Sequence, residues 1–118
     1  MPVLGVCLGH QIIGAYFGVN IKVLKTPKHG KVSNIKISKN CKIYNKMNKI
    51  FQATRYHSLY LDEKNFPNNL QITGYSTDDK TIMSFKHKFY PLYGVQYHPE
   101  SIETHEGSTI IENFVNIL

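Results

Sequence analysis

The stretch GVCLGHQ, residues 5–11, places a cysteine between two glycines, behind an apolar run and ahead of a helical pattern. The run PVLGV (2–6) predicts a buried strand, and residues 9–17 predict a helix that ends at Gly18. Strand, G-x-C-x-G and helix together have the form of a nucleophile elbow, which turns the cysteine out at the carboxyl end of the strand. The N-terminus of the helix would favour the reactive thiolate. The alternative is that Cys7 is a small thiol packed in a tight turn, and the motif alone leaves both open.

A cysteine nucleophile needs a base, and the base needs a group that orients it. Of six histidines, His98 stands out because it ends a strand-like run that Pro99 prevents from continuing. Glu100, two residues on, is close enough to hold the second imidazole nitrogen. Cys7, His98 and Glu100 therefore form a candidate triad, although a loop with a solvated glutamate would give the same His-Pro-Glu.

Most of the remaining chain alternates apolar and polar residues, which is typical of strands with one buried face. The expected strands are 19–25, 31–39, 70–77, 81–88 and 91–98, with a turn at 26–30, a loop at 65–69 and a helix at 107–118 whose apolar face includes Leu118. Residues 53–61, which contain RYHSL, mix strand-like with polar residues. The order of elements predicts an α/β fold with a mixed, largely parallel sheet flanked by helices. Without repeats or linkers, residues 1–118 are expected to form one domain.

Composition excludes several classes of protein. No apolar run approaches the roughly 20 residues of a membrane span, and no signal peptide is present, so a soluble intracellular protein of the cytoplasm or plastid stroma is expected. Two cysteines without a CxxC pair predict neither a disulfide framework nor a zinc site, and no metal is expected. Residues 1–61 carry ten basic residues and no acidic ones, which could indicate nucleic-acid binding. Thirteen of the chain's fourteen basic residues are lysines, and aromatic residues do not alternate with them, which favours a solvated face.

Three motifs in this order, GVCLGHQ, RYHSL and GVQYHPES, resemble the class I (triad) glutamine amidotransferases, whose core is flavodoxin-like. The segments HGK (29–31), TDD with IM (77–83) and SIET…NF (101–114) are similar to the glutaminase subunits of anthranilate synthase and aminodeoxychorismate synthase.

The resemblance implies a chemical role for each member of the candidate triad. Cys7 attacks the side-chain amide of glutamine and forms a glutamyl thioester, His98 shuttles the proton, and Glu100 orients His98. The ammonia passes to a larger, chorismate-binding synthase subunit, near which the HGK turn lies in the family. No cofactor is implied for this subunit.

The resemblance also implies a set of glutamine contacts. The backbone N–H of Leu8 follows the nucleophile and would be one oxyanion donor. Gln11, one helical turn after the nucleophile, would contact the substrate. Ser58 and Leu59 would hold the amino-acid end of glutamine, largely through backbone groups.

The sequence departs from the family in one respect. The family's N-terminal part, with a Gly-Pro-Gly loop that supplies a second oxyanion donor, has no counterpart here, so the chain is expected to be N-terminally incomplete. Three functions therefore stay open. They are the glutaminase subunit of anthranilate synthase (component II) in tryptophan biosynthesis, the corresponding subunit of folate biosynthesis, and an impaired fragment that only binds a partner.

Overall fold

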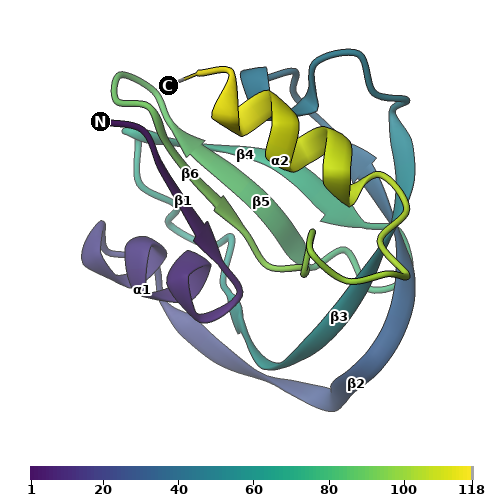
Figure 1. Ribbon diagram of the computed structural model, residues 1–118. Helices are drawn as coiled ribbons and strands as arrows, with labels where there is room; N and C mark the ends of the chain where they lie inside the picture. Colours follow the sequence, from purple (N-terminus) through teal and green to yellow (C-terminus); the bar gives the residue numbers. More distant parts are fainter. Residues whose placement is uncertain (118) are drawn as a thin grey trace.

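A curled six-stranded sheet with two helices makes up the chain (Figure 1), of which the computed structural model describes residues 1–117. The sheet order is β1-β6-β5-β4-β2-β3. The elements are β1 (Val3–Val6), α1 (Leu8–Tyr16), β2 (Ile21–Ile37), the 3-10 helix η1 (Lys42–Tyr44), β3 (Ile50–Leu61), β4 (Leu70–Ser76), β5 (Ile82–His87), β6 (Leu92–Val95) and α2 (Gly107–Val115). The expected mixed α/β architecture is confirmed.

The expectation that the sheet is largely parallel is wrong. Among the described residues the sheet has five strand pairings, of which β1 with β6 is parallel and the other four are antiparallel. The reason lies in the connections: β4, β5 and β6 follow one another through short loops, which can join only antiparallel neighbours. Among the described elements only β1 leads directly into an α-helix, and β1 pairs in parallel with β6, the last described strand.

The predicted turn at 26–30 is instead part of one long strand. β2 runs through it and pairs with β3 along most of its length, so the two strands form the curved ribbon at the base of Figure 1. The register shifts between Val23 and Lys28 and again between His29 and Lys31. Gly30 has a φ of 81°, a conformation that glycine adopts without strain. These irregularities bend the ribbon without ending it.

The core divides into two clusters. One lies between the sheet, η1 and α2 and includes Ile35, Ile43, Phe51, Met83, Tyr97 and Ile110. The other, which includes Val19, Leu61, Leu70, Ile82 and Phe85, has Ile13 of α1 packed against it. A Cβ on Gly14 would lie 2.6 Å from Cδ1 of Leu61, so a residue without a side chain lets α1 approach the sheet.

The closing helix, α2, begins at Gly107 as predicted and ends at Val115, while Leu118 of the predicted apolar face lies outside the described residues. Within residues 1–117, neither helix has the length and apolar character required to cross a bilayer.

Candidate active site

Cys7 occupies a tight turn between β1 and α1. Its φ of 54° and ψ of −100° are unusual for a residue with a side chain, so the surrounding contacts must hold the backbone there. Its N–H donates to Val95 O at 2.8 Å, and its carbonyl accepts from Gln11 N–H at 3.1 Å. Gly5 is required by close packing, because a Cβ there would lie 2.6 Å from Cδ1 of Ile13 and 2.7 Å from the carbonyl carbon of Gly9. The geometry is that of an elbow.

The parallel pairing of β1 with β6 brings the two ends of the candidate site to the same edge. Val6 is level with Val95 in the register, so Cys7 and the segment that begins at Gln96 leave the sheet side by side. Carboxyl ends of parallel strands are where α/β sheets commonly bind ligands.

His98 and Glu100 contact each other directly. Nδ1 of His98 lies 2.8 Å from Oε2 of Glu100, whose side chain is 61% exposed. The backbone of His98 is tied to the sheet and to the following loop: its N–H donates to Thr54 O at 3.2 Å, and its carbonyl accepts from the Thr104 hydroxyl at 2.8 Å. The position of His98 is therefore fixed by its backbone hydrogen bonds, and the orientation of its imidazole by the contact of Nδ1 with Glu100.

Tyr56 of β3 links the thiol to the imidazole. Sγ of Cys7 donates to the carbonyl oxygen of Tyr56 at 3.5 Å, and the Tyr56 ring stands edge-on to the His98 ring with 5.5 Å between centroids. Tyr56 was not singled out from the sequence, although it lies within the RYHSL motif. The structure thus places Cys7 and His98 against the same residue of β3.

Burial raises the pKa of the Cys7 thiol. Hydrogen bonds from the Leu8 backbone N–H and from the Gln96 side chain lower this pKa, while the negative charge of Glu100 raises it further. The Leu8 N–H at the helix N-terminus favours the thiolate as expected, but desolvation outweighs both hydrogen bonds and leaves the pKa raised. The resting group is a thiol, and it needs a base to become a nucleophile.

Gln96 is a second residue that sequence reasoning missed. Its Nε2 lies 3.6 Å from Cys7 Sγ, and its Oε1 accepts from Nε2 of Gln11 at 3.2 Å. The signal was available, because Gln96 is a polar residue in the otherwise apolar run before His98, and a buried amide needs partners.

The predicted glutamine contacts differ in how accessible they are to a bound substrate. Leu8 directs its N–H at the thiol. Gln11 is only 5% exposed, and its Nε2 also donates to Leu59 O at 3.1 Å, so a contact with glutamine would have to use its Oε1. Ser58 is exposed and faces the break in the ladder between β2 and β3. Of these predicted contacts, the backbone near Ser58 is therefore the most accessible to a bound glutamine.

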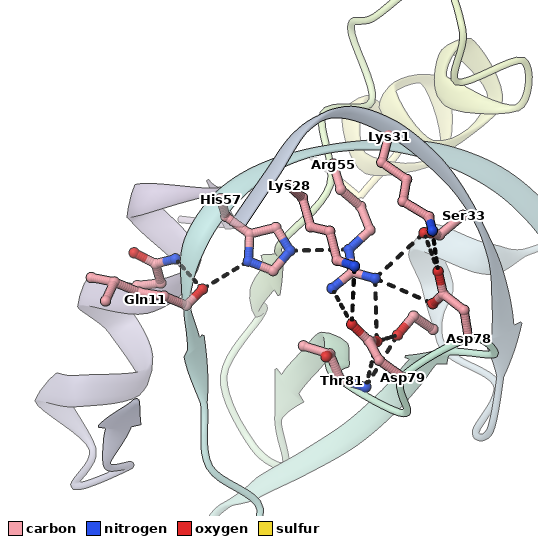
Figure 2. Close-up of polar contacts among 11 residues, drawn as sticks. Gln11, Lys28, Lys31, Ser33, Arg55, His57, Asp78, Asp79 and Thr81 are labelled. Carbon is pink, nitrogen blue, oxygen red and sulfur yellow. Dashed lines mark hydrogen bonds and ion pairs between the residues drawn. The ribbon is translucent and has the colours of Figure 1, made fainter. Parts of the chain in front are cut away.

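A buried polar cluster, to which sequence reasoning assigned no role, extends from Leu59 (Figure 2). The fully buried guanidinium of Arg55 donates to Asp79 at 3.2 and 3.0 Å and to Asp78 at 3.3 Å, and its Nε donates to Nε2 of His57 at 3.1 Å. Nδ1 of His57 lies 2.7 Å from Leu59 O. Burial lowers the pKa of His57 to about 4. Within residues 1–117, no group of three or more His, Cys, Asp or Glu side chains is arranged to hold a metal ion.

Comparison with protein families matches residues 1–118 to "Glutamine amidotransferase class-I". The chain is 48% identical over 117 residues to anthranilate synthase component 2 of Saccharolobus solfataricus, which covers 98% of this chain and 59% of that protein. It is 50% identical over 117 residues to the bifunctional protein TrpGD of Thermotoga maritima, covering 99% of this chain and 20% of that protein.

Among solved structures, a putative GMP synthase protein from Thermoplasma acidophilum superimposes with a TM-score of 0.88 at 27% identity, covering 98% of this chain and 56% of that one. The chain belongs to the class I glutamine amidotransferase family. It spans about three fifths of the length of the anthranilate synthase component 2 relatives that it matches.

Proposed function

We propose that this protein is the glutaminase subunit of a chorismate-using synthase. The observation that carries the proposal is the placement of Cys7 on a strained elbow, level with the segment that bears the paired His98 and Glu100. Membership in the class I glutamine amidotransferase family supports glutamine as the substrate. The proposed reaction uses side chains and backbone groups alone, without a cofactor or metal.

In the proposed mechanism His98 removes the thiol proton, and the Cys7 sulfur attacks the carbonyl carbon of the glutamine side-chain amide. Glu100 accepts from Nδ1–H, which leaves Nε2 of the imidazole as the nitrogen that exchanges protons with the substrate. The Leu8 N–H donates to the developing oxyanion. Protonation by His98 releases ammonia and leaves a glutamyl thioester, which water then hydrolyses to glutamate with His98 as the base.

The ammonia is proposed to pass to a larger synthase subunit that binds chorismate. Relatives named anthranilate synthase component 2, among them those at 48% and 43% identity, favour tryptophan biosynthesis over the aminodeoxychorismate branch. The bifunctional TrpGD relative supports a role in the same biosynthesis.

Glutamate release by the protein with its synthase partner tests the proposal. Cys7→Ser should abolish release, while Cys41→Ser, which removes the other free cysteine of the described chain, should retain it. Comparing anthranilate with aminodeoxychorismate formation on each candidate synthase identifies the branch. Release no greater than that of Cys7→Ser would refute the enzyme and leave a partner-binding module.

A further inference from the structure

A continuous series of buried and partly buried polar contacts joins Cys7 to the Arg55 cluster. From Cys7 it passes through the Gln96 and Gln11 amides to Leu59 O, and from there to His57 and Arg55. Figure 2 shows the central part, in which Gln11 and His57 approach one carbonyl oxygen from opposite sides. Three parts of the fold supply its side chains, since Gln11 comes from α1, Gln96 follows β6, and His57 and Arg55 lie with Leu59 on β3.

The hydrogen bonds fix the tautomer of His57. Arg55 Nε–H can only donate, so Nε2 of His57, 3.1 Å away, must be the acceptor. The remaining nitrogen, Nδ1, therefore carries the proton and donates to Leu59 O at 2.7 Å. The charged groups around the imidazole are Arg55, Lys28 and, from the turn after β4, Asp79. The titratable but neutral His10 of α1 is also near, and its own pKa is lowered by His57. Arg55 and burial together keep His57 neutral.

The carbonyl oxygen of Leu59 thus accepts hydrogen bonds from two side chains, Gln11 and His57. Of these donors, His57 is also held at its other ring nitrogen by Arg55. The Gln11 amide divides its Nε2 between Leu59 O and Gln96 Oε1, at 3.1 and 3.2 Å, so its position depends on where that carbonyl lies. Gln96 in turn places its own amide 3.6 Å from the thiol. A displacement of Leu59 O would therefore change both the backbone at 58–59 and the hydrogen bond to Cys7.

We infer that His57 is a positioning residue: as an Nδ1–H donor it holds Leu59 O in place, and through Gln11 and Gln96 it sets the surroundings of the Cys7 thiol. The effect on glutamine binding rests on the function proposed above, whereas the effect on the thiol does not. Arg55 contributes by fixing the tautomer, and the Asp78 and Asp79 carboxylates balance its charge.

Two amide substitutions distinguish the hydrogen bond made by Nδ1 of His57 from the one made by Nε2. In His57→Asn the amide nitrogen reaches the place of Nδ1, so the donor to Leu59 is kept and the acceptor for Arg55 is lost. In His57→Gln the longer amide reaches the place of Nε2, so the acceptor is kept and the donor is lost. His87→Gln is the matched control, because His87 is another buried histidine, 5% exposed, whose Nδ1 accepts from the backbone of the loop that follows it.

The first readout is the rate at which iodoacetamide alkylates Cys7, measured by peptide mass spectrometry from pH 7 to 10. Cys41, the other free cysteine of the described residues, provides the reference rate in the same molecule. With the Gln96 hydrogen bond loosened, His57→Gln should slow Cys7 alkylation at neutral pH by about 5-fold relative to Cys41, while His57→Asn and His87→Gln stay within about 2-fold.

The second readout is the KM for glutamine in the complex with the synthase. It should rise by about 10-fold in His57→Gln and by much less in His57→Asn, with kcat changing less than KM. The reverse order, with His57→Asn worse in both readouts, would mean that His57 merely satisfies Arg55 and would overturn the inference. If the wild type releases no glutamate while the order of Cys7 alkylation holds, the proposed function fails and the positioning role stands.

Discussion

Two buried neutral histidines should make this fold sensitive to mild acid. His10 is fully buried against Phe85, with 4.9 Å between ring centroids, and in the described chain neither ring nitrogen has a well-formed hydrogen bond. Burial lowers its pKa to about 3; a weak backbone interaction with Gly94 opposes this shift, and nearby His57 adds to it. Burial likewise lowers the pKa of His57 to about 4, aided by Arg55 and Lys28.

The sign of the effect follows from proton uptake. In the unfolded chain both imidazoles bind protons near their ordinary pKa of 6.5, whereas in the fold they do so only near 3 and 4. Between these limits the unfolded state holds more protons, so the free energy of unfolding falls as the pH falls. The loss between pH 7 and pH 5 is about 2 kcal/mol for each histidine, or about 4 kcal/mol together. Asp78 and Asp79, whose pKa values are lowered from 3.8, add their losses only in stronger acid.

Urea unfolding at pH 7, 6 and 5 measures this loss directly. His10→Leu fills the same apolar site without a titratable group, so its loss between pH 7 and pH 5 should be smaller by about 2 kcal/mol, whatever its stability at pH 7. His105→Leu, at an exposed position, controls for the removal of one histidine. An equal loss in His10→Leu and wild type would refute the assignment of a buried neutral imidazole.

Three further substitutions test how the site is held. A Cβ in Gly107→Ala would collide with the backbone of Pro99, so we expect the His98 segment to shift and kcat for glutamine hydrolysis to fall about 10-fold or more in steady-state assays. Glu100→Gln should lower kcat by about 10- to 100-fold, less than for a buried triad carboxylate because the Glu100 side chain is 61% exposed; a wild-type rate would exclude the orienting role. Arg55→Met should cost about 2 kcal/mol in urea unfolding, since it leaves Asp78 and Asp79, whose side chains are 34% and 29% exposed, without their buried partner; unchanged stability would contradict this.

The sequence predicts the candidate residues better than the surroundings that control them. Cys7 and His98 could be singled out because local patterns, an elbow and a strand stopped by proline, mark both positions. The raised pKa of Cys7 could not be predicted, because it depends on how deeply residues remote in sequence bury the thiol. The contacts of Gln96 were missed for the same reason, since its partners Cys7 and Gln11 lie far along the chain. The partners of His57 are Arg55 and Leu59 of the same strand, and these contacts were missed because the burial of Arg55 and His57 depends on the whole fold.

The fold shows the same division between local and remote information. β1, β4, β5 and β6 were predicted within a few residues because the apolar patterns that mark them are local, whereas residues 53–61 of β3 were not assigned as a strand. The continuity of β2 through 26–30 was not predicted, because Pro27 and Gly30 are typical of a turn. Only the pairing with β3 keeps this part of the strand extended. The direction of pairing was misjudged because an apolar strand followed by a helix is typical of parallel sheets, and here only β1 follows that pattern.

That one parallel pairing is nonetheless the one on which the site depends. β1 and β6 are four residues each, or about 13 Å long, and Val6 is level with Val95. If the two strands ran in opposite directions, the residues after them would leave from opposite edges of the sheet, about a strand length apart, and Gln96 could not reach the Cys7 thiol. The antiparallel part of the sheet supplies a rigid frame in which β3 carries Tyr56 and His57 to the same edge. The candidate catalytic residues Cys7 and His98 are therefore brought together by the one parallel pairing among the described strands, while Tyr56 and His57 come from the antiparallel part of the sheet.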